Sequence, residues 1–288
     1  MKYLIFFVLI VSWSACNETS QETEKDEVKK VIEIEEHPEL QSIFKAEDVI
    51  GTTVISEMET GKTWLYNKDR AHQGFLPAST FKIPNSLIAL ETGVITLTDT
   101  LKWNGEDHWN DNWKKDHVLA TAFEVSCVPC YQEIAKKIGV ERMNKHTKAM
   151  NYGKLDVNEE TIENFWLTGD SRITPMEQID FIKNIYHKTL LFEENKPFSK
   201  QSIELLQSIL TKEEGTDYLM QYKTGWAQDD NINTGWVVGY LTHLKTNKVY
   251  AFATNIDRPR SRPSDGFAKA RIDITRNAFG KLGIVELL

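Results

Sequence analysis

Two short motifs far apart in the chain carry residue types suited to nucleophilic chemistry. Ser79 is followed three residues later by Lys82, and a Lys223-Thr224-Gly225 triplet lies well downstream. Residues three apart lie on the same face of a helix, so the Lys82 amine can reach the Ser79 hydroxyl and accept its proton. Together the motifs predict a serine acyl-transfer site.

The Ser-x-x-Lys spacing occurs twice, so it is not diagnostic by itself. Ser42 and Lys45 have the same spacing. Ile43 and Phe44 between them are typical of core contacts in a short amphipathic segment, and we expect no chemical role for this copy.

The setting of Ser79 predicts that it opens a buried helix. Pro77 and Ala78 lead into it, and apolar residues recur behind it at helical spacing as far as Gly93. First-turn N–H groups lack acceptors within the helix, and the helix dipole favours negative charge, so an oxyanion beside Ser79 would be stabilised. Taken alone, the motif could also be a plain serine N-cap of a core helix.

The elements that must position these motifs point to an α+β fold. The chain begins with a predicted hairpin, at residues 51–55 and 63–66, and is then mainly helical from about residue 80 to 210. Three strand-like segments follow, at residues 219–226, 235–241 and 249–256, and an amphipathic helix is predicted at residues 267–279. We expect an antiparallel sheet built from the N- and C-terminal strands, with an inserted helical lobe. Ser79 and the Lys223 strand would then face one cleft, although Lys-Thr-Gly alone could be a polar strand edge.

The N-terminus indicates export. Lys2 precedes an apolar run from Leu4 to Val11, which is too short to span a bilayer but suits the core of a signal peptide. Ser14-Ala15-Cys16 resembles a lipoprotein processing site at which Cys16 becomes lipidated. Trp13 departs from that pattern, and simple cleaved secretion or an uncleaved anchor are the alternatives. We expect a periplasmic or membrane-anchored lipoprotein.

Three segments follow from this interpretation. Residues 1–16 form the signal peptide, and residues 17–37, rich in Glu, Lys, Thr and Gln, form a disordered tether. Residues 38–288 form the folded domain. The 288-residue chain is 41% apolar, which is ample for a core.

Charge and histidine usage exclude other classes. The formal charge is −8, without a basic patch interleaved with aromatics, so nucleic acid is not expected as a partner. The only expected membrane contact is a lipid on Cys16, and the sequence sets no oligomeric state. The seven histidines are scattered, and none forms a Ser-His-Asp nucleophile elbow.

Cys127 and Cys130 form a Cys-x-x-Cys pair without a thioredoxin-like context. We favour two buried thiols, with a disulfide as the alternative in an oxidising compartment. No recognisable spacing nearby supplies the further ligands of a zinc site, so no metal is expected.

A third motif, Ser126-Cys127-Val128, lies at the head of a helical run. With Trp103-Asn104-Gly105, Trp166-Leu167, Ile173-Thr174-Pro175 and Lys223-Thr224-Gly225-Trp226, the series resembles the class D β-lactamases, the oxacillin-hydrolysing serine enzymes, from about Pro38 to the C-terminus. The resemblance implies a β-lactamase/penicillin-binding transpeptidase-like fold and a β-lactam substrate. Tyr152-Gly153-Lys154 replaces the usual Tyr-Gly-Asn, and Asn104 the usual Asp, which puts the local loop structure and the substrate profile in question.

The resemblance also implies catalytic roles. Ser79 would be acylated, Lys82 would take up carbon dioxide and act as a carbamate base, and Trp166 would donate a hydrogen bond to it, with no other cofactor. A free lysine has a pKa of about 10.4, so Phe81, Ile83 and Trp166 must supply an apolar pocket that lowers it. Trp166 could equally be a core residue.

Proton relay and substrate binding complete the expected site. Ser126 would relay a proton to the lactam nitrogen, unless it is only a helix N-cap. The N–H groups of Ser79 and Trp226 would form the oxyanion hole, and Gly225 would let a ligand approach the strand. Substrates of this class carry a carboxylate, and we expect the guanidinium of an arginine to bind it with two hydrogen bonds. Lys223 would help to hold the same end of the ligand. Among Arg258, Arg260, Arg262 and Arg271, we favour Arg271 and expect the other three on an exposed loop.

Three functions are compatible with these motifs. The leading hypothesis is a β-lactam hydrolase that gives antibiotic resistance. A β-lactam sensor that is acylated without turnover is the second, although such receptors carry several membrane helices. A D-Ala-D-Ala peptidase or transpeptidase is the third, and the tryptophan-containing motifs disfavour it.

Overall fold

The described strands form one seven-stranded sheet. The computed structural model describes residues 33–187, 198–229 and 231–286. The strands are β1 (Ile34–Glu36), β2 (Ile50–Glu57), β3 (Thr63–Tyr66), β4 (Thr211–Glu214), β5 (Tyr218–Asp229), β6 (Ile232–His243) and β7 (Val249–Pro259). Their order is β1-β3-β2-β7-β6-β5-β4. Strand β1 runs parallel to β3, and the remaining pairs are antiparallel.

The sheet joins the two ends of the folded chain. Strand β2 pairs with β7, with Val54 opposite Ala253. Both strands are buried along nearly their whole length, because helices cover both faces of the sheet. The α+β prediction, with a sheet built from N- and C-terminal strands, is therefore confirmed.

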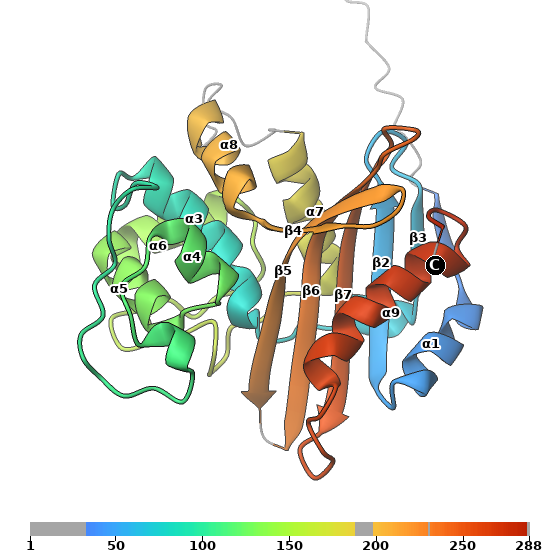
Figure 1. Cartoon of the computed structure of the whole chain (residues 1–288), viewed down its shortest axis with the longest axis horizontal. Helices are drawn as coiled ribbons and strands as arrows, with labels where there is room; N and C mark the ends of the chain where they lie inside the picture. Colours follow the sequence, from blue (N-terminus) through green and yellow to red (C-terminus); the bar gives the residue numbers. More distant parts are fainter. Residues whose placement is uncertain (1–32, 188–197, 230, 287–288) are drawn as a thin grey trace, which may run out of the picture. The chain divides into compact units, whose positions relative to one another are not determined.

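Nine α-helices accompany the sheet in the described residues. They are α1 (Gln41–Ala46), α2 (Lys68–Ala71), α3 (Lys82–Glu91), α4 (Leu119–Glu124), α5 (Val128–Ile138), α6 (Val140–Ala149), α7 (Pro175–Tyr186), α8 (Lys200–Ile209) and α9 (Phe267–Lys281). In Figure 1, α9 and α1 lie over one face of the sheet, α7 lies behind it, and α3 to α6 form a lobe beside β5.

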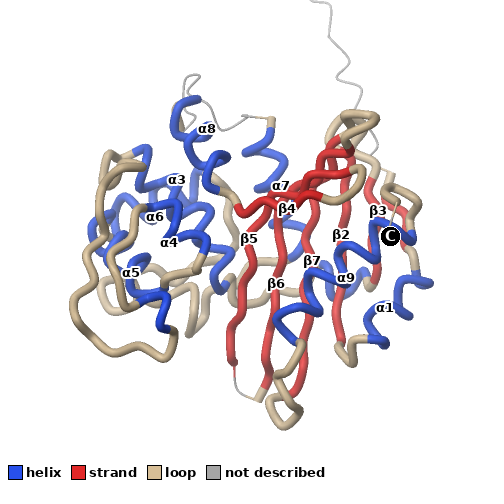
Figure 2. The backbone as a smooth tube through the Cα atoms, viewed as in Figure 1, coloured by secondary structure: helices blue, strands red, loops and turns tan. Residues whose placement is uncertain are grey.

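Two hydrophobic cores hold these layers together. One core packs α1 and α9 against the sheet through residues such as Phe44, Phe252 and Phe279. The other joins the opposite sheet face to α7 and the helical lobe, with Val54, Val238 and Phe181 among its members. Figure 2 shows that the lobe lies beside β5, the strand that carries Lys223 to Gly225.

Local signals place the helix ends that border the site. Helix α7 begins with Pro175 after a capping box, in which Thr174 Oγ1 accepts from the Glu177 N–H and Glu177 Oε2 accepts from the Thr174 N–H. Helix α3 is followed by Gly93 at a φ of 66°, a left-handed conformation that glycine adopts without strain. Gly93 was predicted to end the first of these helical segments, whereas no start for α7 was predicted within the mainly helical region 80–210.

The beginning of the ordered chain differs from the sequence prediction. Residues 34–36, assigned to the tether, form β1, and Ile34 pairs with Thr63. The strand was missed because three residues carry little periodicity. The predicted signal peptide and Cys16 lie outside the described residues. In the described part of the chain, no helix has both the length and the apolarity needed to cross a membrane.

Candidate active site

Ser79 and Lys82 lie at the junction of a 3₁₀ turn and a helix. Ser79 is in the turn η2 (Ala78–Phe81), and Lys82 begins α3. The Nζ atom of Lys82 is hydrogen-bonded to Ser79 Oγ at 3.1 Å. Ala78 has a φ of 51°, in the left-handed region, and its N–H donates to the Trp166 carbonyl at 2.8 Å. The serine is thus fixed on a tight turn at the start of the predicted helix.

Lys82 is almost completely buried. Its side chain is 1% exposed, and the ring of Tyr131 lies 5.0 Å from Nζ. Phe81 and Ile83 are buried beside it in sequence. Burial disfavours the charged amine and lowers the pKa of Lys82 to about 7. The prediction that Lys82 is shielded from water is confirmed, and its amine can lose its proton near neutral pH.

Trp166 packs against the same turn. Its ring stacks on Phe81 with centroids 5.7 Å apart, and the residue is fully buried. The indole Nε1–H has no hydrogen-bond partner. A buried donor without an acceptor costs about 1–3 kcal/mol, so this N–H favours an acceptor group next to it.

The Lys-Thr-Gly triplet lies on β5 against the serine turn. A Cβ atom at Gly225 would be 3.1 Å from Thr80 Cγ2 and 3.3 Å from Ala78 Cβ. A side chain at this position would therefore press on the serine turn, which glycine avoids. Gly225 also borders the cleft in front of Ser79, so the predicted approach of a ligand to this strand stands beside the packing of the turn.

Lys223 is a second buried lysine. It is 2% exposed, and its Nζ donates to the Thr224 carbonyl at 3.0 Å. Burial lowers the pKa of Lys223 well below its usual value, and the charges of Lys82 and Arg271 lower it further. The ring of Phe123 lies 5.5 Å from Nζ. A charge on Lys82 thus disfavours protonation of Lys223.

A cleft of about 750 Å³ opens in front of Ser79. Ser126, Thr224 and Arg271 also border it. Its walls are largely apolar and come from the helical lobe and β5, with Trp109, Trp113, Val125, Val128, Leu167, Trp226 and Ala227 among them. Ser79 therefore faces the cleft, while Lys82 and Trp166 are buried.

Arg271 is the cleft arginine, as predicted. It lies on α9, is 8% exposed, and donates to the Gly225 carbonyl and, at 2.9 Å, to the Ala268 carbonyl. Burial lowers the pKa of Arg271 to about 10, so it stays charged at neutral pH.

Arg258 corrects one expectation. It is buried rather than exposed, because it lies on β7 and donates to the carbonyls of Glu47 and Asp265. Arg262 is exposed and pairs with Asp48. Arg260 is exposed as well.

Ser126 lies between two helices of the lobe. It is half-buried and follows α4, directly before Cys127, the N-cap residue of α5. Cys127 rather than Ser126 therefore caps the helix, which rules out the capping interpretation of Ser126. Cys127 and Cys130 are joined in a disulfide, so the favoured prediction of two thiols is wrong.

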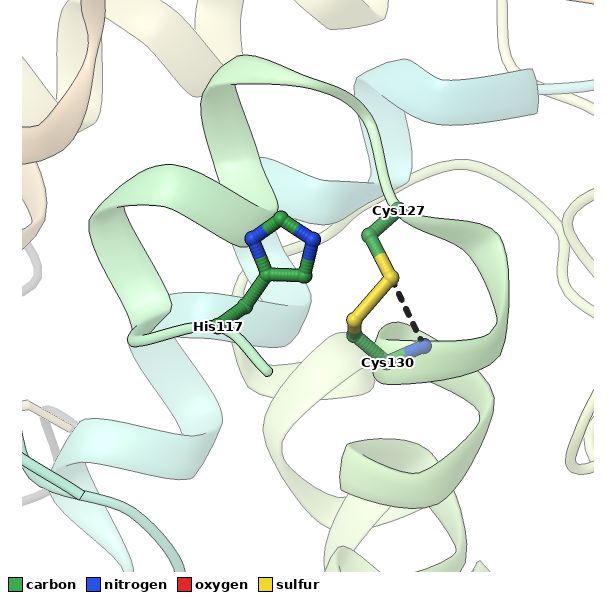
Figure 3. Close-up of side chains that lie close together, drawn as sticks. All are labelled: His117, Cys127 and Cys130. Atoms are coloured by element: carbon green, nitrogen blue, oxygen red, sulfur yellow. Dashed lines mark hydrogen bonds between the residues drawn. A yellow bond between two sulfur atoms is a disulfide. The ribbon is translucent and has the colours of Figure 1, made fainter. Parts of the chain in front are cut away.

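A histidine from outside the Cys-x-x-Cys motif lies next to the disulfide. Figure 3 shows the His117 ring beside Cys127, and its ligand atoms and the two sulfurs lie within 4.8 Å of one another. Sulfurs bonded to each other are not thiolate ligands. The ring nitrogens are hydrogen-bonded at 2.8 Å to the Asn112 carbonyl and at 3.1 Å to Thr121 Oγ1.

Comparisons with known proteins agree with this geometry. A family model described as the penicillin binding protein transpeptidase domain matches residues 50–279. The chain is 39% identical to β-lactamase OXA-48 of Klebsiella pneumoniae over 212 residues, which cover 73% of this chain and 77% of the relative. The crystal structure of the class D β-lactamase YbXI from Nostoc is 40% identical, covers 85% of this chain and 99% of its own, and has a TM-score of 0.78. The chain belongs to the class D serine β-lactamases. That family consists of hydrolases that act on β-lactams.

A receptor is also among the relatives. The regulatory protein BlaR1 of Bacillus licheniformis is 25% identical over 241 residues, which cover 83% of this chain but 38% of the receptor. The C-terminal domain of the BlaR penicillin receptor from the same organism has a TM-score of 0.78. The fold alone therefore does not separate a class D β-lactamase from a receptor domain.

The departure at Lys154 leaves the local loop of this class D β-lactamase intact. Lys154 and Arg172 exchange backbone hydrogen bonds of 2.8 and 2.7 Å, and the Lys154 side chain is exposed. Gly153 has a φ of 58° and packs against the Arg172 carbonyl. Lys154, the third residue of the Tyr-Gly-Lys motif, thus contributes only its backbone to the bridge with Arg172.

The second Ser-x-x-Lys copy, Ser42 and Lys45, is not among the residues that line the cleft in front of Ser79. Ser42 and Lys45 are both exposed on α1, and Ser42 Oγ accepts from Lys281 Nζ at 2.7 Å. Ile43 and Phe44 are buried in the core under α9. The two apolar residues between Ser42 and Lys45 therefore pack α1 onto the core.

Sequence reasoning missed a polar network that supports the serine turn. Thr80 Oγ1 donates to the Pro77 carbonyl at 2.6 Å and accepts from Gln178 Nε2 at 2.9 Å. Tyr152 OH donates to Gln178 Oε1 at 3.4 Å. Gln178 comes from α7, and no local sequence signal links it to the turn. The network locks the backbone on either side of Ser79.

Proposed function

We propose that this chain hydrolyses β-lactams through an acyl-enzyme on Ser79. The observation that carries the proposal is the 3.1 Å hydrogen bond between Ser79 Oγ and Lys82 Nζ. Burial lowers the pKa of Lys82 to about 7, so the group beside the nucleophile can hold a proton and release it near neutral pH.

The steps follow from the positions of the side chains. Ser79 Oγ attacks the lactam carbonyl carbon and gives up its proton on the Lys82 side. As the lactam C–N bond breaks, Ser126 Oγ donates its proton to the leaving nitrogen and takes up the proton that Ser79 released, so that it ends the step as a hydroxyl. Water then attacks the ester carbonyl and gives up a proton on the Lys82 side, and that proton passes to Ser79 Oγ as the C–O bond breaks, which restores the Ser79 hydroxyl. Ser79 and Ser126 border the same cleft, which supports these roles.

The site also fits a carbamate on Lys82, formed from carbon dioxide and the uncharged amine. Lys82 would carry the group, and the unpaired Nε1–H of Trp166 suits one of its oxygens. When bound, it would supply a carboxylate-like base. Phe81, stacked on Trp166, keeps this side of the turn apolar.

We propose that Arg271 binds the substrate carboxylate at the β5 side of the cleft. It is a charged guanidinium that borders the cleft together with Thr224. A guanidinium can hold a carboxylate with two parallel hydrogen bonds. The backbone N–H groups of Ser79 and Trp226 are the proposed oxyanion hole, because both residues line the same space.

A non-hydrolysing receptor is the second candidate, and the likeness to the BlaR penicillin receptor domain favours it. A chromogenic cephalosporin separates the two. Sustained turnover that increases with added bicarbonate, and that is lost in Lys82→Ala, is the expected result. A burst that stops at one product per protein would contradict hydrolysis and leave the receptor.

We also propose that the chain is exported and lipidated on Cys16. The apolar run after Lys2 and the small residues before Cys16 support this. The disulfide between Cys127 and Cys130 is in keeping with an oxidising compartment. Labelled palmitate should enter the wild-type protein but not Cys16→Ala, and unlabelled wild type would contradict lipidation.

A further inference from the structure

Ser126 has a backbone conformation that its neighbours must hold in place. Its φ is 54°, in the left-handed region that residues with a Cβ rarely occupy. Such a conformation persists only where the surrounding structure fixes it. Ser126 borders the cleft together with Ser79. The direction in which its Oγ points therefore depends on the backbone conformation of Ser126 itself.

The N-terminal side of Ser126 is held by hydrogen bonds. The Ser126 N–H donates to the Phe123 carbonyl at 3.1 Å, which continues the end of α4. The preceding carbonyl, of Val125, accepts from Trp113 Nε1 at 3.1 Å. On the other side of Ser126, the Cys127 N–H donates to the Ala122 carbonyl at 2.9 Å. The left-handed Ser126 therefore caps the C-terminus of α4, and the cap is complete only while Cys127 stays in place.

The disulfide anchors Cys127, the residue whose N–H completes this cap, to α5. Cys127 is the N-cap of α5, and its sulfur accepts from the Cys130 N–H at 3.2 Å. Cysteine is not among the residues that cap helices well, and here a covalent bond to Cys130 spans the first helical turn (Figure 3). Cys127 is also fully buried.

We infer that the disulfide between Cys127 and Cys130 positions Ser126 for proton transfer to the lactam nitrogen. The inference rests on the proposed function, because it concerns the acylation half of that reaction. Cys127 and Cys130 are positioning residues and touch no reacting atom. Loss of the disulfide therefore slows acylation, whereas deacylation, which depends on the Lys82 side of Ser79, is retained.

The disulfide can be opened in the folded enzyme from one side. Cys130 borders a second surface cavity of about 430 Å³, lined also by Lys102 and Gln132. A water-soluble phosphine attacks a sulfur. Two electrons pass to the disulfide, water supplies two protons and an oxygen, and the products are two thiols and the phosphine oxide. Alkylation and mass measurement verify two new thiols.

The test measures acylation and deacylation separately with a chromogenic cephalosporin, before and after reduction. We expect acylation to fall about tenfold, a part of the 10²–10⁴-fold that a general acid contributes, and deacylation to change less than about twofold. Cys130→Ala should show the slow acylation without phosphine and should not respond to it. In Ser126→Ala, reduction should have no further effect on acylation, as expected for two groups acting through one step.

Three results would overturn the inference. The first is an unchanged acylation rate in both reduced wild type and Cys130→Ala. The second is an equal decrease in the acylation and deacylation rates on reduction. The third is a decrease in the acylation rate on reduction of Ser126→Ala that is as large as in wild type. The last two would indicate general loosening of the lobe. If oxidised wild type is not acylated at all, the proposed function itself fails, which is a distinguishable result.

Discussion

Replacement of Lys82 by methionine is expected to raise the free energy of unfolding near neutral pH while abolishing hydrolysis. Lys82 is 1% exposed, so its charged form is disfavoured in the folded protein and solvated in the unfolded chain. Methionine has an apolar side chain that carries no such penalty. The gain in stability measures how strongly the fold resists the ammonium group.

The size of the effect follows from the pKa. Burial lowers the pKa of Lys82 from 10.5 to about 7. At about 1.36 kcal/mol per unit, the penalty is roughly 4 kcal/mol at pH 7 and roughly 1 kcal/mol at pH 10. The sign is fixed by proton binding. Between about pH 7 and 10.5 the unfolded chain holds more protons than the folded one, so wild-type stability rises with pH across that window.

Urea unfolding followed by tryptophan fluorescence tests this at pH 7 and pH 10, in buffer depleted of carbon dioxide so that the amine stays free. The stability gain of Lys82→Met should shrink from about 4 to about 1 kcal/mol between the two pH values. Lys45→Met is the matched control, because Lys45 is exposed. It should stay within about 0.5 kcal/mol of wild type at both.

A gain that is absent at pH 7, or equal at pH 7 and pH 10, would refute the reasoning. Either result would mean that Lys82 keeps its charge in the folded state without penalty. The proposed base would then lack the uncharged form on which the chemistry depends. Loss of activity alone in Lys82→Met would not distinguish these cases, which is why the pH dependence of stability is the decisive measurement.

Four further predictions concern single positions. Ser79→Ala should abolish acylation by a labelled penicillin, and Ser42→Ala should react as wild type does; an equal loss of acylation in both variants would mean that Ser79 is wrongly assigned as the nucleophile. Trp166→Phe should still be acylated but release product at least tenfold more slowly, so mass spectrometry should detect an accumulated acyl-enzyme, and its absence would remove the proposed role of the indole N–H. Gly225→Ala should lower stability by about 1–3 kcal/mol, because the added Cβ meets Thr80 at 3.1 Å, and an unchanged melting temperature would contradict this packing argument. Lys154→Asn should leave both stability, within about 0.5 kcal/mol, and turnover unchanged, since this position supplies backbone contacts; a large change in turnover would give the side chain a role that its exposed position does not explain.

The sequence alone identified the features that depend on short-range order. The Ser79 to Lys82 spacing is fixed by the local helical geometry, so their proximity needed no tertiary information. Helix α9 and the strands β2, β5 and β7 followed from periodicity and turns. The order and spacing of the motifs along the chain were enough to indicate the family, because several motifs together are far more specific than any one of them.

Only the tertiary structure decided the properties that depend on residues distant in sequence. The lowered pKa of Lys82 comes from burial beside Tyr131, which lies on another helix. The unpaired N–H of Trp166 appeared once every neighbour was placed. Gly225 proved to be crowded by the serine turn, and Arg258 proved to be buried because segments more than 200 residues apart meet there. Desolvation and close packing are sums over all neighbours in space, and the chain's order does not state which neighbours those are.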